Sequence, residues 1–152
     1  MPFELTSPAF GDGEPIPDRH AMEGDNRSPA LSWSDPPEGT KGLILIVEDP
    51  DAPGGTFHHW IVRDIAADIR ALSENAGRAG SELVMGRNDF GDIAYDGPRP
   101  PQGHGYHRYI FRLAALDTEL RLPTGAIGPD VWEAAEGHVL EEARLTGIYE
   151  RT

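Results

Sequence analysis

The sequence contains no cysteine among its 152 residues. This absence excludes a disulfide framework, thiol catalysis and cysteine-ligated zinc or iron–sulfur sites. The unbroken apolar run Leu43 to Val47 is too short to span a membrane, and the first residues have neither the basic nor the apolar part of a signal peptide. We therefore expect a cytoplasmic protein without stable membrane insertion.

Lysine is also scarce, because Lys41 is the single lysine beside 26 acidic residues. The formal net charge is −13 and the sequence pI is about 4.7. Such a chain lacks the clustered cations that a nucleic acid or an anionic membrane requires, so neither is expected as a partner. Any anion that binds must be small and held locally. The composition is typical of proteins adapted to concentrated salt and also of proteins from high-GC genomes.

Glycine and proline are abundant by contrast. The sequence contains 18 glycines and 14 prolines, spread along the chain between short apolar runs. This pattern favours many strands and turns over a bundle of helices. No shift in composition marks a boundary, so we expect a single domain over residues 1–152 with one core.

The stretch from Gly42 to Arg63 predicts two strands joined by a stiff turn. The first strand is apolar enough to be covered on both faces, and alternation places Asp49 in the row of its odd-numbered residues. The turn contains two prolines followed by two glycines, so its first part is rigid and its last part is flexible. In the second strand the adjacent His58 and His59 must point to opposite faces, so only one of them can share a cavity with Asp49.

A second informative stretch runs from Met85 to Gly105 and is rich in glycine and proline. Long loops of this kind are commonly functional, and a poorly ordered crossover is the alternative. The loop leads into a predicted strand, Tyr106 to Leu116, whose odd-numbered residues face the core. His107 begins that row beside the loop. It is either a pocket residue or a core histidine satisfied by a backbone carbonyl.

The remaining segments carry less information. Apolar residues at helical spacing predict a helix from Asp130 to Ala143, followed by a short strand from Leu145 to Tyr149. An irregular or 3₁₀ turn is predicted for Ile69 to Leu72. His20 lies in a polar loop and is expected to be solvated.

Several motifs together resemble the phosphatidylethanolamine-binding protein family, and specifically its bacterial and archaeal branch of Raf-kinase-inhibitor-like proteins. The resemblance rests on the order and spacing of the motifs and covers nearly the whole chain. It implies a mainly β fold, a Greek-key β-sandwich with a C-terminal α-helix and short helical turns. The motifs are Leu5 to Phe10, Ser28 to Trp33, Asp49 to Pro53, His59-Trp60, Gly86 to Gly91, the proline- and glycine-rich residues before His107-Arg108-Tyr109, and Glu136 to Leu140.

The same resemblance implies a small pocket that takes phosphate, acetate or a phospholipid head group. Arg99 stands where a small residue is expected, so it would narrow the pocket or add a cation to it. If Asp49 pairs with one nitrogen of His59 or His107, the other nitrogen is left to donate to an anion. Carried over residue by residue, the ligand-binding residues are Asp49, Ala52, Pro53, His59, Pro100, Pro101, His107 and Tyr109.

Three classes of function compete. The first, which we favour, is a binding protein for a small anion or phosphorylated headgroup without a cofactor. For this class the resemblance implies modulation of a partner kinase or protease, and a homodimer. The second is a hydrolase that uses Asp49, His59 and His107 directly or through a divalent metal, although no Gly-x-Ser-x-Gly elbow is present. The third is a purely structural sandwich.

Overall fold

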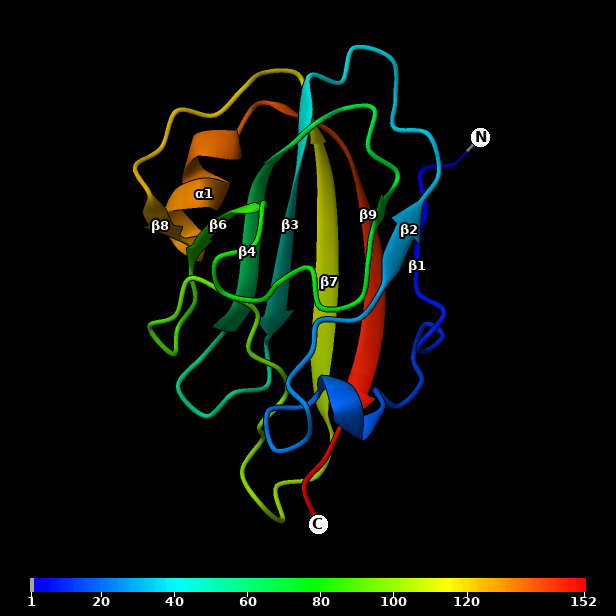
Figure 1. Ribbon diagram of the computed structural model, residues 1–152, viewed down its shortest axis with the longest axis vertical. Coiled ribbons are helices and arrows are strands. Elements are labelled where there is room, and N and C mark those ends of the chain that lie inside the picture. Colours follow the sequence, from blue (N-terminus) through cyan, green and yellow to red (C-terminus); the bar gives the residue numbers. More distant parts are fainter. Residues whose placement is uncertain (1) are drawn as a thin grey trace.

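The computed structural model describes residues 2–152, which form nine strands, one α-helix and one short 3₁₀ helix (Figure 1). The helical segments are η1, Asp18–His20, and α1, Gly128–Ala135. The strands are β1 Leu5–Thr6, β2 Leu31–Trp33, β3 Gly42–Asp49, β4 Phe57–Ile65, β5 Ala71–Leu72, β6 Val84–Arg87, β7 His107–Leu116, β8 Gly125–Ile127 and β9 Val139–Tyr149.

The strands form two sheets that pack against each other. One sheet has three strands in the order β1-β2-β5, and the other has six in the order β8-β6-β4-β3-β7-β9. The main core lies between them, with Leu31 and Trp33 contributed by the small sheet and Leu45 and Phe111 by the large one. This arrangement confirms the mainly β, Greek-key sandwich expected from the sequence.

Strand β3 is buried on both faces, as its apolar run predicts. Leu43, Leu45 and Val47 pack into the core between the sheets. Ile44 and Ile46 pack on the other face, together with the buried side of α1. The row of odd-numbered residues continues to Asp49 at the end of the strand, which places a carboxylate at the rim of the main core.

The prediction of a helix from Asp130 to Ala143 is wrong in its second half. Helix α1 ends at Ala135, and Gly137 then adopts a left-handed backbone with φ of +81°. From Val139 onward the chain is strand β9, which pairs antiparallel with β7 along nearly its whole length. Pairing with a distant strand therefore outweighs the local helical spacing. The α-helix lies near the C-terminus, but a strand follows it.

Two smaller expectations also fail. Within the segment predicted as a turn, Ala71 and Leu72 form β5 and pair with β2. His20 is fully buried instead of solvated, and its Nδ1 atom lies 2.8 Å from the carbonyl oxygen of Arg27. The loop that carries His20 folds back against the loop before β7, since the Met22 N–H donates to the Pro98 carbonyl. Loop composition alone does not reveal this long-range contact.

Candidate functional site

A pocket of about 170 Å³ lies where β3 ends and β4 and β7 begin. These strand ends are at the lower end of the molecule in Figure 1. The pocket wall comes from segments that are far apart in the sequence, and the structure brings all eight sequence-predicted site residues into it. We call it the proline-walled pocket. It is lined by Asp49, Ala52, Pro53, Phe57, His59, Phe90, Arg99, Pro100, Pro101, His107 and Tyr109.

A β-bulge in β4 decides which of the two adjacent histidines enters this pocket. Val47 pairs with Trp60 and Glu48 pairs with His58, so His59 is an extra residue without a partner on β3. Trp60 faces the core between the sheets, and regular alternation from it would place His58 on that side. The bulge reverses the alternation and turns His59 into the pocket instead, a role that bulges often have near functional sites.

Asp49 is held by two donors at the inner end of the pocket. The backbone N–H of Asp51 donates to its Oδ1 atom at 2.8 Å, and Nδ1 of His107 donates to its Oδ2 atom at 2.7 Å. On the other side of the imidazole, Nε2 of His107 lies 2.6 Å from Nδ1 of His104. The result is a hydrogen-bonded row from a buried carboxylate through His107 to an exposed histidine in the loop.

His59 has a different partner, because its Nδ1 atom lies 2.9 Å from the backbone carbonyl oxygen of Asp96. A carbonyl can only accept, so the proton of the neutral ring must be on Nδ1. Burial lowers the pKa of His59, and the hydrogen bond to Asp96 opposes that shift without cancelling it. The neutral ring therefore has an unprotonated Nε2, and His59 is part of the pocket wall. Of the two histidines considered as partners for Asp49, the structure selects His107.

The hydroxyl group of Tyr109 is the most informative polar group in the wall. Tyr109 is 1% exposed, its ring contacts that of His59 at 5.2 Å between centroids, and its hydroxyl has no hydrogen-bond partner. Burial raises the pKa of Tyr109, and the negative charge of Asp49 adds to the effect, so the hydroxyl stays protonated at neutral pH. This buried donor makes no hydrogen bond within the usual distance, and the Asp49 carboxylate is near enough to attract its proton.

Two aromatic residues of the pocket are missed by the sequence analysis. Phe57 and Phe90 pack edge to face with their centroids 4.7 Å apart, and both rings also contact the ring of His59. Phe57 could have been found, because it precedes His59 by two residues and so shares its face of the strand. Phe90 comes from a loop, where no alternation applies.

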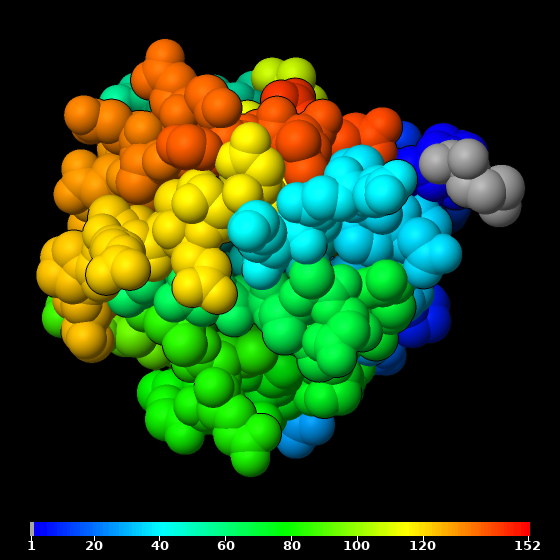
Figure 2. Space-filling model, turned by 90° about the horizontal axis from the view of Figure 1, so that it is seen from above, coloured from blue at the N-terminus to red at the C-terminus, as the bar shows by residue number. Residues whose placement is uncertain are grey.

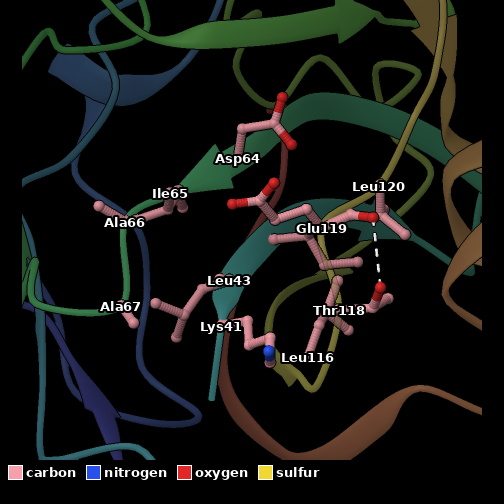
Figure 3. A pocket seen from close by; sticks show the side chains of 12 residues that line it. Lys41, Leu43, Asp64, Ile65, Ala66, Ala67, Leu116, Thr118, Glu119 and Leu120 are labelled. Carbon is pink, nitrogen blue, oxygen red and sulfur yellow. Dashed lines mark hydrogen bonds between the residues drawn. The ribbon is translucent and has the colours of Figure 1, made fainter.

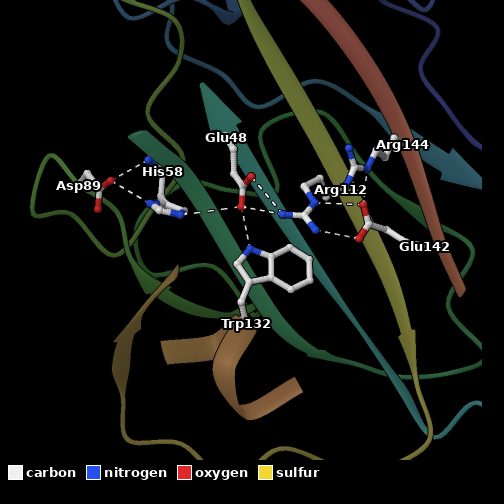
Figure 4. Close-up of polar contacts among 7 residues, drawn as sticks. All are labelled: Glu48, His58, Asp89, Arg112, Trp132, Glu142 and Arg144. Carbon is white, nitrogen blue, oxygen red and sulfur yellow. Dashed lines mark hydrogen bonds and ion pairs between the residues drawn. The ribbon is translucent and has the colours of Figure 1, made fainter. Parts of the chain in front are cut away.

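His58 lies on the opposite face of the sheet, in a network of charged side chains next to α1 (Figure 4). Its Nδ1 atom donates to Asp89 at 2.9 Å. Glu48 accepts hydrogen bonds from Arg112 and from the indole N–H of Trp132, and the Arg112 guanidinium stacks 3.9 Å from the Trp132 ring centroid. Because these charged groups already pair with one another, we interpret the network as an anchor that ties α1 to the sheet.

A larger hollow of about 410 Å³ lies at the other end of the sheet, at the start of β3 and the end of β4 (Figure 3). Figure 2 shows this end of the molecule from above. The charged residues of the hollow, Lys41, Asp64 and Glu119, are exposed to solvent. Three buried side-chain polar atoms of residues 2–152 lack a partner, and Tyr109 is the only one of their three residues that lines either of the two cavities. The proline-walled pocket is therefore the better candidate site.

Comparison with known proteins agrees with the fold and the motifs. A family model described as phosphatidylethanolamine-binding protein matches residues 6–150. The chain belongs to this family. It is 49% identical over 152 residues to a UPF0098 protein of Methanothermobacter thermautotrophicus, with 98% of this chain and 99% of the relative covered. It is 46% identical to a UPF0098 protein of Aquifex aeolicus, with 98% of this chain and 89% of the relative covered.

A solved structure in the family has the same fold. The crystal structure of E. coli YbcL, described as a new member of the mammalian family, superposes with a TM-score of 0.92 at 37% sequence identity. The match covers 99% of both chains. The sandwich is therefore the shared fold of the family.

No helix within residues 2–152 is long and apolar enough to cross a bilayer. A family member from Mycobacterium tuberculosis, 41% identical over 149 residues with 98% of this chain and 73% of the relative covered, is named as a lipoprotein, LppC. The cytoplasmic location expected from the sequence stays a prediction.

Proposed function

We propose that this member of the family binds one small anion in the proline-walled pocket, either phosphate or the phosphate group of a small molecule or headgroup. The observation that carries the proposal is the buried Tyr109 hydroxyl without a partner. Leaving such a group unpaired costs about 1–3 kcal/mol, and an anion oxygen in the pocket would remove that cost.

Two further groups support an anion at this position. His107 has Asp49 on one side of its ring, so an anion on the other side would hold a proton on Nε2 between them. Arg99 adds a guanidinium to the wall, and its Nη1 atom contacts the sulfur of Met22 at 3.9 Å and no carboxylate of residues 2–152. These local groups are needed because a net charge of −13 repels anions at longer range.

The size and stiffness of the wall favour a small ligand. A volume of about 170 Å³ is below the roughly 300–1,000 Å³ of pockets that enclose drug-sized molecules, so only a headgroup of a lipid would fit. Pro53, Pro100 and Pro101 each fix a backbone dihedral angle in the wall. A wall that keeps its shape when empty lowers the entropic cost of binding.

The hydrolase alternative receives less support. The pocket wall contains no serine, threonine, cysteine or lysine, so the attacking group would have to be a water activated by a histidine. Within residues 2–152 no three histidine or acidic side chains are grouped as metal ligands. The names of the relatives described above state no enzymatic activity. Turnover of a chromogenic phosphate ester that is lost in His59→Ala would favour the hydrolase.

We include in the same proposal that the chain modulates a partner kinase or protease and that it forms a homodimer. Phe90 lines the pocket and is 39% exposed, so a partner that contacts it would sense the occupant of the pocket. Phosphate-dependent binding of a partner, lost in Phe90→Ala, is the result expected if the pocket regulates such an interaction. Sedimentation of the purified chain tests the dimer.

Titration of phosphate into wild type and Tyr109→Phe tests the binding function directly. We expect one site per chain, and about 1.5–3 kcal/mol weaker binding in the variant because it loses a hydrogen bond to a charged group. The variant should be at least as stable as wild type without ligand, since it lacks the unpaired hydroxyl. Tyr106→Phe is the matched control, because Tyr106 is 58% exposed and lies outside the wall. Equal phosphate affinity in all three proteins would contradict the proposal.

A further inference from the structure

The proline-walled pocket presents acceptors as well as donors to its occupant. The Nδ1–H of His59 is committed to the Asp96 carbonyl, so Nε2 of the neutral ring carries a lone pair, and His59 is part of the pocket wall. Asp49, in the same wall, is also an acceptor. An anion that has only acceptor oxygens would therefore place them next to these lone pairs, and acceptor atoms repel one another.

We propose that the pocket selects tetrahedral anions that carry a proton, namely hydrogen phosphate and the protonated form of phosphate monoesters, over sulfate and phosphodiesters. The P–O–H group donates to Nε2 of His59, while other oxygens accept from Tyr109 and from protonated His107. The inference rests on the proposed function and narrows its ligand class. A phosphodiester lacks the proton, so an intact phospholipid is a poorer ligand than a phosphate monoester.

The surroundings of His59 keep its Nε2 atom unprotonated. Three aromatic rings contact the His59 ring: Phe57 from its own strand, Tyr109 from β7 and Phe90 from the loop after β6. Asp49 and Asp89 favour the charged ring, but desolvation is larger and lowers the pKa of His59. Sulfate has no proton to donate, so the His59 ring would have to take one up before sulfate could bind, and this costs free energy. A ligand that carries its own proton avoids that cost.

Phosphate and sulfate provide a matched pair of ligands. At about pH 8, above the second pKa of phosphate, both ions are tetrahedral dianions of similar size, and only hydrogen phosphate carries a donor. A site built around one hydrogen bond rejects an analogue that lacks the bonding group, because a buried polar atom is then left unpaired. We expect phosphate to bind about tenfold or more tightly than sulfate. At about pH 6, where roughly half of methyl phosphate carries the proton, it should exceed dimethyl phosphate by a similar factor.

A second measurement counts the protons that are taken up from solution when a ligand binds, and it needs no variant. Methyl phosphate at about pH 8 is mostly the dianion without a proton, so its binding must take up one from solution. Calorimetry in two buffers of different ionisation enthalpy should therefore show about one more proton taken up with methyl phosphate than with inorganic phosphate. Equal proton uptake for the two ligands would contradict ligand protonation in the pocket.

The variant His59→Gln tests the residue that makes the selection. The glutamine amide can turn its NH₂ group toward the ligand, so the ratio of phosphate to sulfate affinity should fall close to one. His138→Gln is the control, because His138 is exposed and pairs with Asp117 away from the pocket; it should keep the wild-type ratio. Equal binding of phosphate and sulfate by wild type overturns the selectivity alone. Failure of wild type to bind either ion overturns the proposed function and the selectivity together.

Discussion

His104 and His107 are joined by a hydrogen bond of 2.6 Å between Nδ1 of the first and Nε2 of the second. In the free protein this contact occupies the one nitrogen of His107 that is not bonded to Asp49. Gly103 and Gly105 flank His104 with φ of +76° and +81°, and neither has a neighbour within 4 Å of a Cβ position. His104 itself is exposed, so its side chain can turn away from His107 without opening the core.

Replacing His104 by alanine should strengthen phosphate binding. The anion no longer competes with His104 for Nε2 of His107, and a hydrogen bond of this kind is worth about 1 kcal/mol, or roughly a fivefold change in affinity. Calorimetric titration measures the change, with His138→Ala as a control at an exposed histidine outside the pocket. Weaker binding in His104→Ala would show instead that His104 contacts the ligand.

The sequence predicts the architecture and the pocket residues well, but it predicts the local geometry of the pocket poorly. Alternation is enough to place His107 and Tyr109 in one row and Asp49 at the rim of the core, because β3 and β7 are regular where those residues lie. Whether His58 or His59 enters the pocket depends on a bulge, and the sequence shows no signal for it. Only the family resemblance selects His59. The partner of His59, the Asp96 carbonyl, is equally hidden, because any residue type can supply a carbonyl.

The error in the predicted helix from Asp130 to Ala143 has a physical explanation. Apolar residues from Trp132 to Ala143 fit a helix, yet Ala143, Leu145, Gly147 and Tyr149 are buried at every second position in β9. That alternation, preceded by Gly137, is a signal for a strand that the helical spacing obscures. The strand is long because β7 offers an edge along which it can pair.

Arg108→Gln should change stability in a pH-dependent way. Arg108 donates to both carboxylate oxygens of Asp51, at 3.0 and 2.9 Å, and this pairing lowers the pKa of Asp51 from 3.8 to about 2. Because the folded pKa is below the unfolded value, the pair stabilises the fold above about pH 4, and this contribution is lost as the pH falls toward about 2.

The variant should therefore melt slightly below wild type at neutral pH, by a small amount because the pair is solvent-exposed. The difference in melting temperature should shrink as the pH falls below about 4. Circular dichroism melts over a pH series measure it. A difference that stays constant down to low pH would mean that Arg108 acts through packing and not through the charge of Asp51.

Low salt should destabilise the fold if the acidic composition is an adaptation to saline conditions. With 26 acidic residues and a net charge of −13, repulsion among surface carboxylates grows as screening falls. We expect the melting temperature to rise with sodium chloride from a few millimolar to the molar range. A melting temperature independent of salt over that range would remove the halophilic interpretation and leave a high-GC genome as the simpler explanation.

We expect the proline-walled pocket to hold an anion between histidines from two strands, and calorimetric titration of phosphate into His59→Ala and His107→Ala tests this expectation. Each variant should bind phosphate more weakly by roughly 1.5–3 kcal/mol, the range for a hydrogen bond to a charged group. Circular dichroism should show that both variants fold. Wild-type affinity in both folded variants would place the ligand elsewhere and leave these histidines with a structural role only.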